Sequence, residues 1–193
     1  GSAASTFLFD DIEQFATPAQ IGLPMDFESV VTTADFSNFD GGTATVIANS
    51  QSNMDNSSAM VGQMVRNGGQ PWGGSAITLA SNLDFSTMNN VSMKVYTAAP
   101  VGTTVRLKIE DGMGGFAELD ALTTTTNQWE TLTWDFSGTA NSFNTLVLLF
   151  DFGNIGNGSA ASTFLFDDIE QFATPSQIGL PMDFESIVTT ADF

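Results

Sequence analysis

Three of the four basic residues of this sequence fall, with its only tyrosine, at alternate positions of two short segments. These four residues are Lys94 and Tyr96 in segment 91–97, and Arg106 and Lys108 in segment 104–110. Alternate residues of an extended strand share one face. If the two strands are neighbours, the four side chains form one patch, which would bind an acidic polysaccharide or an acidic face of another repeat. The alternative is cross-strand pairing, worth well under ~1 kcal/mol per solvent-exposed pair, with Glu110, Glu118, Asp120 or Glu130.

A second candidate for ligand contact is Trp72, which lies in the glycine-rich segment NGGQPWGGS. The apolar face of an indole complements the C–H face of a pyranose ring, so an exposed Trp72 could stack on a sugar. The alternative is that this loop tryptophan folds back over one end of the domain. The sequence leaves both interpretations open.

The elements that must position these residues are β-strands. Segments 91–97 and 104–110 alternate apolar and polar residues, which is typical of strands with one buried face. The EDGMGG segment predicts a turn before a further strand that begins at Phe116. Segment 143–152 is apolar on both faces, which favours a central strand. The other predicted strands are 43–49, 58–65, 75–81, 129–136 and 162–172. The fold class predicted is therefore all-β, an antiparallel two-sheet β-sandwich.

The chain also repeats itself, because residues 1–36 return at 158–193 with only Ala19/Ser176 and Val30/Ile187 different. The offset of 157 residues matches one ordinary domain. We therefore expect one repeat of a tandem array, 25–172, between proline-containing joints at 16–24 and 173–181. Residues 1–15 would then be the closing strand of the preceding repeat, and 182–193 the opening strand of the next. Either 5–15 or 162–172 could complete the central sandwich, and the position of the joint favours 162–172.

Composition excludes several classes of function. The chain has 22 acidic and four basic residues, a net charge of −18, and neither His nor Cys. Nucleic-acid binding needs many more Lys and Arg residues. The commonest general base, the thiol nucleophile and the usual zinc ligands are missing, and no nucleophile elbow or phosphate loop occurs, so we expect no enzyme. The longest apolar run is too short to span a bilayer. The acidic, lysine-poor composition suits a secreted protein in salty water.

The order of the motifs resembles a known group of domains. The chain carries PMDFES (24–29), PWGGS (71–75), VSMKVYTAAPVGTTVRLKIED (91–111), WETLTWDFSG (129–138) and FLFDDIEQF (164–172). In this order they resemble the jelly-roll, galactose-binding-like modules related to carbohydrate-binding modules. Such modules are common in large secreted adhesins and polysaccharide-degrading enzymes of marine bacteria. The resemblance implies a jelly-roll sandwich, often with a structural calcium ion and sometimes with a glycan site.

That resemblance also implies where calcium would bind. In such modules the first and last strands lie close together, so acids of the opening and closing motifs can share an ion. The acids at these positions are Asp26, Glu28, Asp167 and Asp168. Calcium takes six to eight oxygen ligands and needs neither His nor Cys. The alternative is ordinary solvated acids in an acidic protein.

Together these features predict a structural or adhesive repeat of a very long extracellular surface protein or filament. It would act through reach and many weak contacts. Its partners would be neighbouring repeats, identical chains alongside and a polysaccharide. The alternative is a glycan-binding accessory module of a secreted polysaccharide-degrading enzyme.

Overall fold

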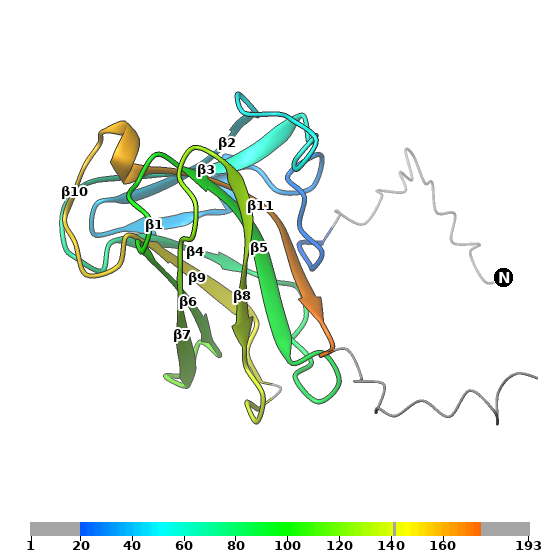
Figure 1. Ribbon diagram of the computed structural model, residues 1–193. Coiled ribbons are helices and arrows are strands. Elements are labelled where there is room, and N and C mark those ends of the chain that lie inside the picture. Colours follow the sequence, from blue (N-terminus) through cyan, green and yellow to red (C-terminus); the bar gives the residue numbers. More distant parts are fainter. Residues whose placement is uncertain (1–19, 141, 175–193) are drawn as a thin grey trace, which may run out of the picture.

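The computed structural model describes residues 20–140 and 142–174, and these residues form two packed β-sheets (Figure 1). The strands are β1 (Ser37–Phe39), β2 (Gly42–Ala48), β3 (Met60–Gly68), β4 (Gly74–Thr78), β5 (Asn90–Thr97), β6 (Thr104–Glu110), β7 (Phe116–Leu122), β8 (Trp129–Asp135), β9 (Thr145–Phe150), β10 (Gly156–Asn157) and β11 (Thr163–Phe172). The same residues contain two single-turn 3-10 helices, η1 (Thr33–Asp35) and η2 (Ala160–Ser162). Neither helix of this described part is long or apolar enough to cross a membrane.

The strands divide into two antiparallel sheets. Sheet I has the order β1-β4-β9-β6-β7, and sheet II has the order β10-β3-β11-β5-β8, with β2 paired to β3. Each sheet turns one face inward to the core and the other outward (Figure 1). The prediction of an antiparallel two-sheet sandwich is confirmed.

The core lies between the sheets and follows the alternation of the strands. From β6, Val105, Leu107 and Ile109 are buried in it, whereas the residues between them point outward. Aromatic rings fill its centre, where the Phe150 ring lies 5.1 Å from Phe164 and 5.4 Å from Phe166, centroid to centroid. Such close rings bury much apolar surface, so the two sheets are held together mainly by hydrophobic contact.

The predicted strands are found, with ends that differ by a few residues. The turn after Glu110 is a hairpin in which the Asp111 carboxylate accepts hydrogen bonds from the backbone of Met113 (2.8 Å) and Gly115 (2.9 Å). The sequence analysis did not identify β1 and β10. Both are short, three and two residues, and carry no alternation long enough to recognise.

Strand β11 occupies the middle of sheet II, between β3 and β5. The closing strand of this sandwich is therefore the copy predicted at 162–172. The other copy, at 5–15, lies outside the described residues, as do the segment 182–193 and residues 16–19 and 175–181 of the two joints. A bulge between Asp167 and Glu170, with Asp168 at a φ of 45°, interrupts the pairing of β11 with β5.

The described chain begins and ends at the same end of the sandwich. Met25 forms an antiparallel bridge with Ile169, and the carbonyl of Ile21 accepts a hydrogen bond from the backbone of Ala80 at 2.8 Å. Residues 20–23 border the same hollow as Gln171. Ile21 and Leu23 pack against the core, so this part of the predicted joint belongs structurally to the sandwich.

Candidate functional site

The outward face of sheet I carries a groove of about 560 Å³. Strands β1, β4, β6, β7 and β9 contribute its walls and floor, and the chain before β4 and after β9 closes one end. The residues that line this sheet I groove are Ser37, Asn38, Phe39, Trp72, Ala76, Arg106, Lys108, Glu110, Glu118, Val147, Leu149 and Phe152. Its size lies within the range of roughly 300–1,000 Å³ that is typical of ligand sites.

The floor of the groove is apolar because the central strand β9 is apolar on both faces. Leu146, Leu148 and Phe150 point into the core, while Val147 and Leu149 point outward and line the groove. Both outward residues are only about 5% exposed (5% and 4%). An outward strand face of this kind is usually polar, so these two side chains give the groove an apolar floor between the flanking side chains.

The two cations of the groove are already paired. The Arg106 guanidinium donates to both Asp120 carboxylate oxygens (2.6 and 2.9 Å) and to Glu118 (2.7 Å). These hydrogen bonds from Arg106 lower the pKa of Asp120 and raise the pKa of Arg106. Lys108 pairs with Glu110 at 2.7 Å. The cross-strand pairing considered from the sequence is thus present for Arg106, whereas Lys108 pairs within its own strand, and the charges that line the groove cancel.

The same cations lie over aromatic rings. The guanidinium carbon of Arg106 is 3.8 Å from the centroid of the Phe152 ring, and the Lys108 ammonium is 4.4 Å from that of Phe116. Cation–π contacts of this kind stabilise by about 0.5–1 kcal/mol at exposed sites. They hold the rings in place at the margin of the groove.

Trp72 stands at one end of the groove with half of its surface exposed (50%). Its indole nitrogen donates to the Asp40 carboxylate at 2.8 Å, and the Asp40 carbonyl accepts from the Gln70 backbone at 2.9 Å. These bonds fix the indole without burying it. Of the two sequence interpretations, the geometry leaves a large part of the ring open to a ligand.

The structure separates the four residues that the sequence placed on one face. Strands β5 and β6 are not neighbours, because β5 belongs to sheet II and β6 to sheet I. Arg106 and Lys108 therefore line the groove with Trp72, whereas Lys94 and Tyr96 lie on the outward face of sheet II. The prediction of one joint patch is wrong, because alternation fixes the face of a strand within its sheet but not which sheet it joins.

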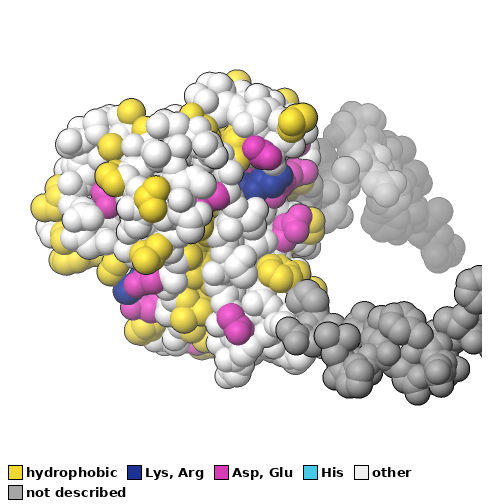
Figure 2. All heavy atoms as spheres, in the orientation of Figure 1, with side chains coloured by type: hydrophobic (Ala, Val, Ile, Leu, Met, Phe, Trp, Pro, Cys, Tyr) yellow, Lys and Arg dark blue, Asp and Glu magenta, His cyan; other side chains and the backbone are white. Residues whose placement is uncertain are grey.

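On the sheet II face, Lys94 also has a partner, the Asp168 carboxylate at 2.9 Å. Tyr96 packs on Trp129 with a ring separation of 5.7 Å. In the view of Figure 2, basic side chains adjoin acidic ones on the surface. Three of the four cations of this acidic protein, Lys94, Arg106 and Lys108, are thus held in ion pairs. The fourth, Arg66, is buried and donates to backbone carbonyls.

The four acids predicted to share calcium do not come together as one cluster. Asp26 accepts from the backbone of Glu28 in a local turn (3.1 Å), and Glu28 accepts from the backbones of Ala59 (2.7 Å) and Met60 (3.2 Å) at the start of β3. Asp168 is taken up by Lys94. Within residues 20–140 and 142–174, no three acidic side chains gather closely enough to hold a metal ion.

Asp167 differs from the other three acids of this set in being fully buried. Burial raises the pKa of its carboxyl group. Asn56 donates to its Oδ2 at 2.9 Å, and Ser58 and the Asp168 amide favour the charged form. Among the described residues, however, no donor meets Oδ1 in hydrogen-bonding geometry. A buried oxygen without a partner is costly, so calcium at Asp167 stays a prediction, with its other ligands unassigned.

The two-sheet sandwich of this chain is similar to solved carbohydrate-binding modules. The family 11 carbohydrate-binding module from Clostridium thermocellum, in complex with a β-1,3-1,4-mixed-linked tetrasaccharide, matches with a TM-score of 0.56 and 13% identity, over 82% of this chain and 96% of that chain. The CBM22-1 xylan-binding domain from Paenibacillus barcinonensis matches with a TM-score of 0.53 and 19% identity, over 79% and 94%. This chain has the fold of carbohydrate-binding modules. That confirms the jelly-roll resemblance noted from the motifs.

A larger protein contains a similar fold. An exo-β-agarase matches with a TM-score of 0.57 and 11% identity, over 79% of this chain but only 25% of the agarase chain. No protein-family model matches the sequence, and no curated protein does. At these identities the likeness shows the carbohydrate-binding-module fold and leaves the ligand to be argued from the groove.

Sequence reasoning missed most of the groove. Phe39, Val147, Leu149 and Phe152 line it, but none was singled out as a site residue. The signal was present in segment 143–152, since a strand that is apolar on both faces has an outward face that something must cover. In the sequence analysis, this pattern served only to predict that the strand is central in its sheet.

Proposed function

We propose that this protein is a non-catalytic module that binds a neutral polysaccharide chain in the sheet I groove. The observation that carries the proposal is the pairing of a half-exposed, fixed Trp72 with an apolar floor at Val147 and Leu149. Sugar rings present apolar C–H faces to such surfaces and hydroxyl groups to the polar rim. The similar modules that are named for xylan and for a mixed-linked glucan support this class of ligand.

The charges of the groove favour an uncharged ligand. Arg106 forms ion pairs with Asp120 and Glu118, and Lys108 forms one with Glu110. An acidic polysaccharide would have to displace these carboxylates and approach a molecule with a net charge of −18. A neutral glycan meets neither cost, so the acidic ligand considered from the sequence becomes the less favoured one.

The experiment is calorimetric titration and affinity electrophoresis of the whole chain with neutral polysaccharides: xylan, mixed-linked β-glucan and agarose. Alginate serves as the acidic comparison. We expect at least one neutral chain to bind, and the Trp72→Ala variant to bind it about tenfold or more weakly, since one ring contact of about 1.4 kcal/mol is a factor of ten.

The matched control is Met113→Ala, an exposed apolar side chain in the β6–β7 turn away from the groove lining. It should bind as the wild type does. Binding of alginate in preference to every neutral chain, or unchanged binding by Trp72→Ala, would contradict the proposal.

The duplicated ends support a second role, as one repeat of a secreted tandem array. Residues 1–36 and 158–193 are nearly identical at an offset of one domain, which fits neighbouring repeats. In such an array weak binding by each module is multiplied through effective concentration. Two linked repeats should then bind an immobilised neutral polysaccharide at least tenfold more tightly than one, by surface plasmon resonance. Equal binding by one and two repeats would leave the array without an adhesive role.

A further inference from the structure

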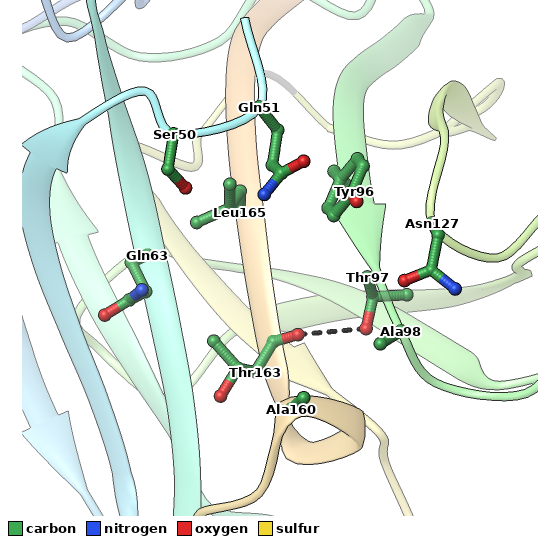
Figure 3. A pocket seen from close by; sticks show the side chains of 10 residues that line it. All are labelled: Ser50, Gln51, Gln63, Tyr96, Thr97, Ala98, Asn127, Ala160, Thr163 and Leu165. Carbon is green, nitrogen blue, oxygen red and sulfur yellow. Dashed lines mark hydrogen bonds between the residues drawn. The ribbon is translucent and has the colours of Figure 1, made fainter.

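The outward face of sheet II holds a second hollow, on the opposite side of the sandwich from the groove. It measures about 260 Å³. Its floor is one rung of the sheet, where Leu165 of β11 lies directly opposite Gln63 of β3 and Tyr96 of β5. Neighbouring strands lie about 4.8 Å apart, so the rung from Gln63 to Tyr96 spans about 10 Å. Figure 3 shows the side chains of all three rung residues around this sheet II pocket.

Loops close the sides of the sheet II pocket, and hydrogen bonds to residues of the neighbouring strands hold these loops in place. Trp129 packs on Tyr96 and donates its indole N–H to the carbonyl of Gln51 at 2.9 Å, which anchors the loop between β2 and β3. On the other side, the backbone of Asn127 donates to the carbonyl of Thr97 at 2.7 Å. The Thr97 hydroxyl in turn donates to the carbonyl of Thr163 at 2.9 Å (Figure 3). The walls are therefore preformed rather than loose.

The lining of this pocket carries no charge. Its ten residues are Ser50, Gln51, Gln63, Tyr96, Thr97, Ala98, Asn127, Ala160, Thr163 and Leu165. In a protein with 22 acidic residues, a surface hollow lined only by amides, hydroxyl groups and apolar groups is distinctive. It offers no attraction to an ion, and it suits a ligand that is polar but uncharged.

Several polar groups of the pocket have unused hydrogen-bonding capacity. Within the described residues, the side-chain amides of Gln51 and Gln63 and the hydroxyl groups of Ser50 and Tyr96 bond to no protein group. Each amide offers two donors and one acceptor oxygen, and each hydroxyl can do both. A matching ligand must both donate and accept hydrogen bonds around a ring-sized apolar face that rests on Leu165 and Tyr96.

We infer that the sheet II pocket binds a single neutral sugar ring, as a second carbohydrate site independent of the sheet I groove. A pyranose carries hydroxyl groups that donate and accept, and its C–H face matches the Tyr96 ring and Leu165. The pocket is smaller than the range of roughly 300–1,000 Å³ that holds larger ligands, so it accepts one ring or a chain end. Two sites on opposite faces would let one module link two glycan chains.

The test is NMR titration of the ¹⁵N-labelled full chain with the methyl glycosides of glucose, galactose, mannose and xylose. Glucuronic acid and glucosamine serve as charged comparisons. We expect at least one neutral glycoside to shift the backbone amides of Gln63, Tyr96 and Leu165, with a Kd of about 1–10 mM, as befits one ring with few contacts. The double variant Gln51→Ala/Gln63→Ala should bind about tenfold more weakly or worse.

Controls separate this site from the groove and from misfolding. Gln128→Ala changes an exposed amide of the β7–β8 loop that does not line the pocket, and it should bind as the wild type does. Trp72→Ala should leave these shifts unchanged because it alters only the groove. Ala160→Trp should narrow the pocket and weaken binding with both amides intact, and thermal melting confirms that each variant folds.

Three results would overturn the inference. The first is an absence of shifts at the pocket amides with every neutral glycoside. The second is undiminished binding by both Gln51→Ala/Gln63→Ala and Ala160→Trp. The third is equally tight binding of the charged sugars, which would show that the uncharged lining does not select the ligand.

Discussion

The sheet I groove and the sheet II pocket differ in how their linings treat charge. The sheet I face keeps its charges at the surface and neutralises them in pairs, with Arg106 held by Asp120 and Glu118. On the sheet II face, the pocket has a lining without charge, and Asp167 is buried nearby beneath the β2–β3 loop that carries Asn56. The two aspartates respond in opposite directions. Hydrogen bonds from Arg106 lower the pKa of Asp120, whereas burial raises that of Asp167.

This contrast teaches that a neutral surface can arise by two routes. Pairing keeps long charged side chains in place over aromatic rings and gives the groove a polar rim. A lining without charged residues, as in the sheet II pocket, leaves amides and hydroxyl groups free to bond a ligand, because no charged side chain competes for them. The first route suits an extended ligand that contacts many groups, and the second suits a small ligand that is recognised by a few hydrogen bonds.

The largest expected effect comes from the two leucines that form corresponding floors. Leu149 and Leu165 are 4% and 5% exposed, each on the outward face of an inner strand. Replacing either by Ala should lower the free energy of unfolding by about 2–5 kcal/mol, measured by urea denaturation. Each change should weaken binding on its own face only. Loss of both binding activities in a folded single variant would mean that the two faces are coupled.

The next effect tests whether a cation completes the environment of Asp167. Chelator-stripped protein should take up calcium in isothermal titration, and its melting temperature should rise. At a concentration 100 times the Kd, the ligand adds about 2.7 kcal/mol to stability. Asp167→Asn should abolish this rise, while Asp120→Asn, on the other face, should keep it. A melting temperature insensitive to calcium in the wild type would end the calcium prediction.

A smaller effect separates the two aspartates by pH in calcium-free buffer. The folded-state pKa of Asp167 is raised above the unfolded value of about 3.9, so its carboxyl group favours the folded state only while it is protonated. That contribution is lost as pH rises from about 4 through the folded-state pKa. Asp167→Asn should therefore stabilise the protein relative to wild type, by an amount that grows with pH in urea denaturation from pH 4 to 8. An equal difference at every pH would contradict a raised pKa.

The smallest effect on stability is expected from the ion pair between Arg106 and Asp120 on the sheet I face. The pKa of Asp120 is lowered, so its contribution is present at neutral pH and is lost as pH falls through its folded-state pKa. Because this pair is partly exposed and screened, Asp120→Asn should cost less than about 1 kcal/mol at pH 7 and less still at high salt. Guanidinium denaturation would mask such an effect, so urea is the denaturant to use. A cost above that of the leucine changes would show that the pair is effectively buried.

Much of the fold could be predicted from the sequence. Alternation placed Val105, Leu107 and Ile109 in the core and gave β6 its observed bounds. Turn chemistry at Asp111 predicted the β6–β7 hairpin, because its carboxylate caps the turn locally. Such features depend on residues close together in the chain, and a sequence displays them directly.

The sites were harder to predict from the sequence than the strands, because they depend on which strands become neighbours. The alternation of apolar and polar residues predicts that Lys94 and Arg106 both point outward. Only the pairing of β5 with β11 and of β6 with β9 shows that they lie on different sheets. Trp72 was identified as a candidate because a tryptophan among glycines stands out. The sheet II pocket combines residues from five separate segments, and no local pattern connects Gln51 with Asn127.

The antiparallel bridge between Met25 and Ile169 has a mechanical consequence. It brings the entry and exit of the sandwich to one end. In the tandem array proposed above, tension would therefore pull the two ends of each module apart from neighbouring points. The hydrogen bonds of β11 would then open one after another, like a zipper, instead of resisting together in shear. A string of such modules would yield at low force and lengthen as successive modules unfold. It would serve better as an extensible tether than as a rigid strut.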